Sequence, residues 1–140
     1  MSEPGAILGL AHIGVAVRSL EEATSLWTRR LGFALVSTES LASMRLKIAF
    51  LRAGDAEIEL LEPTSPDSPV GRFLQKRGEG IHHLSFYVAD LEAALARAEA
   101  QGLELIDRTP REGSHGTKIA FLHPRAMGGV LVELCERRAK

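Results

Sequence analysis

The sequence lacks several features that would assign it to a specialised class of protein. Its single cysteine, Cys135, cannot form an internal disulfide, which fits a reducing compartment. The 17 Lys and Arg residues are balanced by 18 Asp and Glu residues, so no basic surface for nucleic acid is expected. No apolar run approaches the roughly 18 residues of a membrane span, and no basic segment precedes an apolar stretch at the N-terminus. We therefore expect a cytoplasmic protein with a small-molecule ligand and neither nucleic-acid nor membrane partners.

What the sequence does contain is the composition of one globular domain and an internal repeat. The 140 residues are 45% hydrophobic and 25% charged, which is sufficient for a single domain with its own core. The pentapeptide KIAFL occurs at residues 47–51 and 118–122, an offset of 71 residues (118 − 47). The same offset aligns HIGVAVRSLEEA, which starts at His12, with HLSFYVADLEAA, which starts at His83. The repeat predicts two similar modules, about residues 7–62 and 81–136, with a connector over about residues 63–80.

The order of elements within each module follows from hydrophobic periodicity. Alternating apolar residues predict that each module begins with a strand. In the first module, Ser19 followed by Glu22 predicts a helix that starts at a capping box and ends at Gly32. Three strands are then expected, so both modules have the order βαβββ, and the connector allows a short helical turn at residues 70–76. The strands expected after the helices are residues 33–36, 45–51 and 56–61 in the first module, and 103–106, 118–122 and 130–134 in the second.

Four polar residues occupy equivalent positions in the two modules. His12 and His83 point away from the aliphatic side chains of the first strand of their modules, and Glu59 and Glu133 do the same on the last strand. Imidazole and carboxylate ligands suit a divalent transition metal such as Zn, Co, Ni or Mn. If the modules pack with pseudo-two-fold symmetry, the four residues converge, and we expect one divalent metal ion per chain. Taken singly, each His or Glu is also compatible with an ordinary core or surface role.

Three further features each allow two interpretations. His82 points opposite to His83, which favours a core or supporting role over metal ligation. Cys135 shares the face of Glu133, yet a lone cysteine near a strand end is usually a small hydrophobic residue. The loop at residues 112–116 fits either an anion-binding loop or a flexible connection.

Several longer segments carry a family resemblance that covers nearly the whole chain. The paired modules with His and Glu ligands resemble the vicinal oxygen chelate superfamily, which includes glyoxalase I, extradiol dioxygenases and bleomycin-resistance proteins. The resemblance implies an α+β fold, in which two tandem βαβββ modules form a curved, open-barrel-like mixed sheet around a metal site, and a homodimer. It also implies that His12, Glu59, His83 and Glu133 are the metal ligands. Within the superfamily, the segments that resemble the methylmalonyl-CoA epimerases are GEGIHHLSFYVADLEAAL, GSHGTKIAFLHP, GGVLVELCE and IELLEPTSPDSPVGRFLQKRGEG.

The resemblance implies epimerisation at C2 of an acyl-CoA substrate, methylmalonyl-CoA. Loss of the C2 proton would give a metal-stabilised enediolate, and reprotonation on the opposite face would invert the centre. Glu133 is the expected base. Some family members have a further glutamate on a middle strand, but the matching segment here, MRLKIAF at residues 44–50, has no carboxylate, so Glu59 is the expected second base. His115, Lys118 and Lys47 are weaker candidates for that role or for binding the substrate carboxylate or a CoA phosphate.

Two other functions fit the same residues. A glyoxalase I-like lactoylglutathione lyase would share the four metal ligands, although the HGTKIAFLHP and GGVLVEL segments argue against it. A non-catalytic binding or resistance protein of the same fold would sequester a small molecule, and the four ligand-type residues disfavour a metal-free version of it.

Overall fold

The structure is a computed structural model that describes residues 5–137, and it confirms the βαβββ order of both modules. The described residues form two compact units, an N-terminal unit of residues 12–82 and a C-terminal unit of residues 83–137 with residues 5–11. None of the helices in these residues is long and apolar enough to span a membrane. The elements are β1 (Ile7–Ala16), α1 (Leu20–Ser25), a π-helical turn (Leu26–Arg30), β2 (Leu35–Leu41), β3 (Leu46–Ala53), β4 (Ala56–Pro63), α2 (Pro69–Arg77), β5 (Gly80–Val88), α3 (Leu91–Ala100), β6 (Arg111–Glu112), β7 (Lys118–Leu122) and β8 (Val132–Glu136), with short 3₁₀ turns at Ala42–Met44, Ser114–Gly116 and Pro124–Met127.

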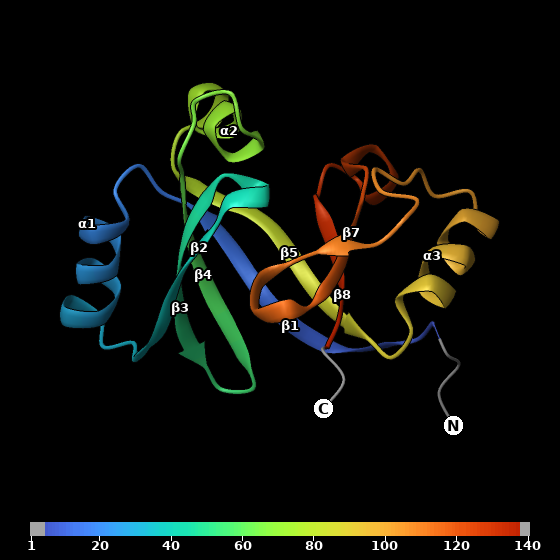
Figure 1. Ribbon diagram of the computed structural model, residues 1–140, viewed down its shortest axis with the longest axis horizontal. Helices are drawn as coiled ribbons and strands as arrows, with labels where there is room; N and C mark the ends of the chain where they lie inside the picture. The colour runs from blue at the N-terminus through green and yellow to red at the C-terminus, as the bar shows by residue number, and fades with distance from the viewer. Residues whose placement is uncertain (1–4, 138–140) are drawn as a thin grey trace. The chain divides into compact units, whose positions relative to one another are not determined.

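The N-terminal unit is a four-stranded mixed sheet with a core on each face. Its strands lie in the order β2–β3–β4–β1, and only the β1–β4 pair of this set is parallel. Helix α1 contacts β3 and β4 (Figure 1), and α2, which confirms the helical turn expected in the connector, contacts β4. The core on the α1 side contains Val15, Val17, Ala49, Leu51 and Leu60, and the core on the α2 side contains Ala16, Leu46, Ile48, Phe50, Leu61, Val70 and Leu74.

The C-terminal unit repeats the arrangement with one helix against its sheet. Its strands lie in the order β5–β8–β7–β6, with β5 parallel to β8. Helix α3 contacts β7 and β8 (Figure 1), and its apolar side chains pack with Val88, Ala120, Leu122, Val132 and Leu134. Because side chains alternate along a strand, the opposite face of this sheet receives Phe121 and Glu133.

The first predicted helix is present, but its last turn is wider than an α-helix. Ser19 is its N-cap, and the Oγ atom accepts a hydrogen bond of 3.1 Å from the backbone N–H of Glu22, as the capping motif predicts. After Ser25 the chain continues as a π-helical turn, in which the N–H of Leu31 donates to the carbonyl of Leu26. Gly32 ends the segment with a φ of 106°, a backbone conformation that glycine adopts without strain.

The strand predicted at residues 103–106 is wrong. Only Leu105 forms an isolated bridge, to Leu122. The carboxylate of Asp107 accepts a 2.9 Å hydrogen bond from the N–H of Phe121, so a side chain takes the position of a backbone carbonyl and interrupts the ladder. Pairing with β7 resumes at β6, after Pro110. The strand expected at residues 33–36 lies later than predicted, at β2, because Phe33 instead packs against Trp27 with ring centroids 5.4 Å apart.

A glutamate at the end of each unit's last strand caps that unit's first helix. Glu62 Oε1 accepts a 2.7 Å hydrogen bond from the N–H of Leu20, the first residue of α1. Glu136 Oε1 accepts a 2.9 Å hydrogen bond from the N–H of Leu91, the first residue of α3. Both N–H groups lie in the first turn, where they have no partner within the helix. The repeat therefore preserves a bond between the last strand and the first helix.

The Glu62→Ala substitution should lower the free energy of unfolding by about 1–2 kcal/mol, because it leaves the N–H of Leu20 without its carboxylate acceptor. Urea denaturation of the two proteins measures the difference. Glu21→Ala is the matched control, since it removes an acidic charge from the same helix turn without removing this bond, and it should cost only a few tenths of a kcal/mol. Equal losses in both variants would show that charge, and not the hydrogen bond, is responsible.

Candidate functional site

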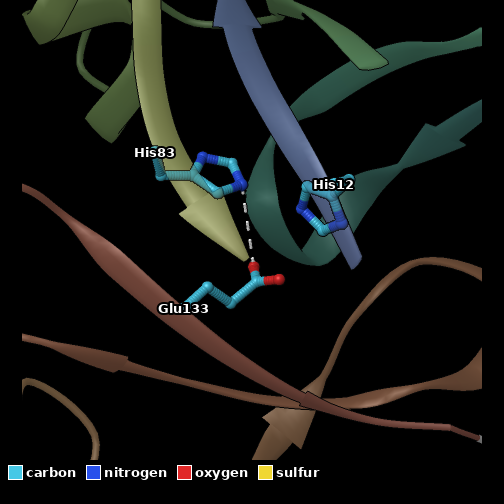
Figure 2. A group of neighbouring side chains, drawn as sticks. All are labelled: His12, His83 and Glu133. Carbon is cyan, nitrogen blue, oxygen red and sulfur yellow. Dashed lines mark ion pairs between the residues drawn. The ribbon is translucent and has the colours of Figure 1, made fainter. Parts of the chain in front are cut away.

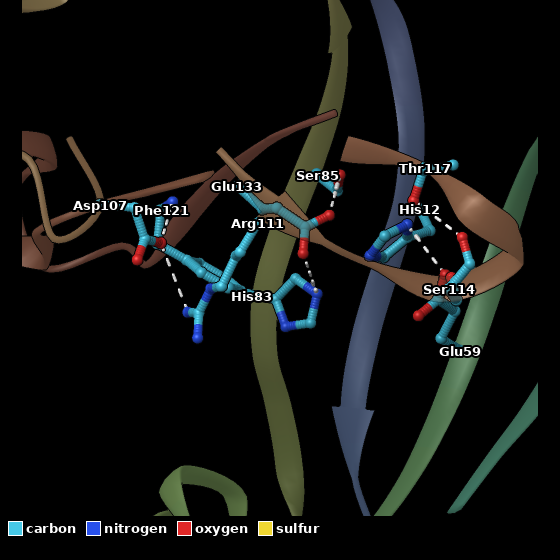
Figure 3. Close-up of polar contacts among 10 residues, drawn as sticks. All are labelled: His12, Glu59, His83, Ser85, Asp107, Arg111, Ser114, Thr117, Phe121 and Glu133. Carbon is cyan, nitrogen blue, oxygen red and sulfur yellow. Dashed lines mark hydrogen bonds and ion pairs between the residues drawn. The ribbon is translucent and has the colours of Figure 1, made fainter. Parts of the chain in front are cut away.

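The N-terminal unit contains one buried histidine–glutamate pair. His12 lies on β1 and Glu59 on the parallel strand β4, with exposed fractions of 8% and 5%. The Nδ1 atom of His12 is 2.9 Å from Oε2 of Glu59 (Figure 3). Two ligand-type side chains are thus held together in a place where solvent has little access.

The C-terminal unit contains the equivalent pair with an additional partner. His83 on β5 and Glu133 on β8 are 6% and 3% exposed, and Nε2 of the histidine is 3.9 Å from Oε1 of the glutamate (Figure 2). The hydroxyl of Ser85 donates a 2.5 Å hydrogen bond to Oε2 of Glu133 (Figure 3). The His83 ring also lies edge-on to Phe121, with ring centroids 5.6 Å apart.

The two copies of KIAFL place a phenylalanine beside each carboxylate. Phe50 of β3 is the cross-strand partner of Glu59, and Phe121 of β7 is the cross-strand partner of Glu133. Directly opposed residues of an antiparallel pair share one face of the sheet. Both rings are buried, so each carboxylate has an apolar neighbour that limits its access to water. KIAFL therefore forms the strand next to the glutamate-bearing strand in both units.

The residues present fit a divalent transition metal. His12, His83 and Glu133 are buried residues of a kind that could hold a metal ion, and Glu59 offers a further carboxylate paired to His12. Imidazole nitrogen and carboxylate oxygen match the ligand preferences of Zn, Co, Ni and Mn. Buried ionisable groups of this number are costly to a fold unless they are paired or bind a metal. A bound metal ion would therefore offset the cost of burying these four residues.

The structure separates the two lysines from the carboxylates on their own sheets. Lys47 is the cross-strand partner of Glu62, and Lys118 is the cross-strand partner of Glu136. Each lysine is exposed and lies on the face of its sheet opposite to Glu59 or Glu133. His115 is exposed in the 3₁₀ turn Ser114–Gly116 and has a left-handed backbone with a φ of 55°. These three residues are thus surface residues outside the buried pairs.

Sequence reasoning missed three residues near the buried pairs. Ser85 is one, although it follows His83 by two positions on β5 and the period of two in a strand places both on the same face. Glu39 of β2 is another: it is half-buried and pairs with Ile48, which puts a further carboxylate on the face of the N-terminal sheet that carries Glu59. Arg111 is the third, with its guanidinium 5.2 Å from the Phe121 ring centroid and 3.3 Å from the carboxylate of Asp107 (Figure 3).

His82 belongs to the packing of the N-terminal unit. Its ring lies edge-on to Phe73, with centroids 5.0 Å apart, and burial lowers its pKa to about 4. The ring is therefore neutral near pH 7, which agrees with a core role for this residue.

Stability should fall as the pH is lowered from about 6.5 to 4, because His82 must gain a proton. Its folded pKa lies below the unfolded value of 6.5, so the unfolded chain binds more protons in this window. The contribution is present above pH 6.5 and is lost as the pH falls, with an upper bound of about 3 kcal/mol. Urea unfolding of wild type and His82→Gln at several pH values checks it. If the free energies of unfolding of the two proteins changed equally between pH 7 and 4.5, His82 would be excluded as the source.

Comparison with known proteins identifies the family of this chain. The family described as "Glyoxalase/Bleomycin resistance protein/Dioxygenase superfamily" matches residues 11–121. The chain is 46% identical over 127 residues to the uncharacterized protein YqjC of Bacillus subtilis (strain 168), which covers 91% of each protein. It is 35% identical over 129 residues to the mitochondrial methylmalonyl-CoA epimerase of Dictyostelium discoideum, covering 91% of this chain and 78% of the relative.

A solved structure shares both sequence and fold with the chain. It is a methylmalonyl-CoA epimerase in complex with methylmalonyl-CoA and NH4+, with 36% sequence identity and a TM-score of 0.92, covering 96% of this chain and 97% of that one. The resemblance to methylmalonyl-CoA epimerases and the vicinal oxygen chelate fold expected from the sequence are confirmed. The chain therefore belongs to the glyoxalase/bleomycin resistance protein/dioxygenase superfamily.

Proposed function

We propose that the protein epimerises methylmalonyl-CoA at C2. The observation that carries the proposal is the duplicated histidine–glutamate pair, buried at equivalent positions of two units, in a chain similar to epimerases over most of its length. An acyl-CoA substrate, one divalent metal ion per chain and a homodimer are parts of this proposal.

The metal ion would be held by His12, Glu59, His83 and Glu133. When bound, it would supply Lewis-acid stabilisation of the negative charge that develops on a substrate oxygen as C2 loses its proton. The buried setting supports the proposal, because electrostatic interactions are stronger where water is excluded.

Proton transfer is assigned to the two carboxylates. Glu133 would remove the C2 proton from one face of the substrate, and Glu59 would exchange a proton with the other face. Inversion needs a proton carrier on each side of C2, and the two units supply one carboxylate each. The adjacent Phe121 and Phe50 favour this role because they limit the access of water to the two carboxylates.

Deuterium exchange at C2 tests the proposal. Metal-reconstituted protein is incubated with methylmalonyl-CoA in deuterated water, and the C2 proton is followed by NMR. We expect metal-dependent exchange together with loss of stereochemical purity of the thioester. No exchange by a protein that holds one metal ion per chain would rule the proposal out. A parallel assay with the hemithioacetal of methylglyoxal and glutathione detects a glyoxalase I-like lyase, and inactivity with both substrates would favour a binding protein.

A further inference from the structure

Ser85 provides a buried hydroxyl that contacts Glu133 in the C-terminal unit. The residue is 0% exposed, and its Oγ–H donates to Oε2 of Glu133 at 2.5 Å. Ser85 and Glu133 are direct register partners on the parallel strands β5 and β8, so the backbone sets the position of the hydroxyl. A hydroxyl that donates to a carboxylate at this distance makes one of the stronger hydrogen bonds in proteins.

The N-terminal unit has no such hydroxyl at the equivalent position. The register partner of Glu59 is Gly14, which has no side chain. Glu59 contacts Nδ1 of His12 through Oε2 at 2.9 Å, whereas the closer contact of Glu133 is with Ser85 and His83 is 3.9 Å away. The two pairs are therefore equivalent in residue type but differ in how each carboxylate is held.

We propose that Ser85 is a positioning residue for Glu133. By holding Oε2, the hydroxyl fixes the side-chain rotation of Glu133 and leaves Oε1, the oxygen nearer His83, for the reaction centre. Glutamate has three side-chain torsions, so an anchored carboxylate is ordered before substrate and metal bind. This inference rests on the proposed function, in which Glu133 is both a metal ligand and the base. Supporting side chains of this kind commonly change metal affinity or activity by 10- to 100-fold.

Ser85→Ala tests the proposal with two independent readouts. In the exchange assay, kcat should fall by about 10-fold or more while KM stays within about twofold, because the substrate contacts themselves are unchanged. In calorimetric titration of the metal-free protein with Mn²⁺, the dissociation constant should increase by about 5- to 10-fold. Ser85→Cys, whose thiol is a weak donor of similar size, should lie between alanine and wild type in both measurements, and it replaces the alanine variant if that variant does not fold.

Ser68→Ala is the matched control for loss of a buried hydroxyl. Ser68 is also 0% exposed, and its Oγ accepts from the N–H of Gly71 as the N-cap of α2. It should lower thermal stability without changing kcat or the Mn²⁺ affinity. A kcat of Ser85→Ala within threefold of wild type, or an equal fall in Ser68→Ala, would overturn the positioning role. If wild type shows no C2 exchange, the proposed function fails, and the Mn²⁺ titration still tests Ser85. Unchanged Mn²⁺ affinity in both Ser85 variants would then overturn the inference.

Discussion

Glu133→Gln should reduce C2 proton exchange with methylmalonyl-CoA by about 1,000-fold, because an amide cannot accept the proton that the carboxylate removes. The amide oxygen keeps a possible metal ligand and an acceptor for the Ser85 hydroxyl, so the fold should be little changed. NMR in deuterated water measures the exchange at C2. Calorimetric titration of the metal-free variant measures its affinity for the metal ion. This effect is among the largest we expect, since replacing the carboxylate by an amide removes the proposed proton carrier.

Glu136→Gln is the control for that substitution. Glu136 lies on the same strand as Glu133, yet its carboxylate caps α3 through the N–H of Leu91. The glutamine oxygen can still accept this bond, so exchange should stay within about twofold of wild type. If Glu133→Gln kept more than a tenth of the wild-type exchange rate, Glu133 would not be the main base.

His83→Ala should lower the bound metal from about one ion per chain to a small fraction, and the metal dissociation constant should rise at least 100-fold. In the proposed four-residue set, loss of His83 would remove a direct bond to the ion, and we expect this effect to exceed the 10- to 100-fold effect of a supporting residue. Elemental analysis after dialysis and titration of the metal-free protein give the two quantities. Exchange at C2 should disappear with the metal.

His82→Gln is the control for the loss of metal. The two histidines are adjacent in sequence, but His82 packs against Phe73 and is neutral near pH 7, whereas His83 is paired with Glu133. His82→Gln should retain one ion per chain. Metal retention by His83→Ala, or equal loss in both variants, would contradict the assignment of His83 as a ligand.

The repeat made most of the fold predictable from one sequence. An offset of 71 residues between two copies of a strand and a helix implies that both halves share one order of elements, and β1 to β4 and β5 to β8 confirm it. The positions of His12 and His83 follow from the same offset, and those of Glu59 and Glu133 from a slightly larger one of 74 residues (133 − 59), together with the period of two in a strand. These four residues are indeed buried in pairs within their units.

The remaining features depend on contacts that periodicity does not encode. The ladder between residues 103–106 and β7 is interrupted by the carboxylate of Asp107, and its hydrogen bond to Phe121 joins residues 14 positions apart. Ser85 meets Glu133 only because of the parallel register of β5 and β8, which the sequence does not specify. The capping of α1 by Glu62 joins residues 42 positions apart, which hydrophobic periodicity does not indicate.

The capping of α1 by Glu62 has a consequence for synthesis of the chain. Helix α1 has six residues, too few to be stable in isolation, and its cap is supplied 42 residues further along. In a nascent chain, α1 therefore lacks this cap until β4 has been made. The same holds for α3, whose cap Glu136 follows Leu91 by 45 residues. Each of these helices is consequently capped only once the last strand of its unit is available, and its first turn lacks that stabilising bond until then.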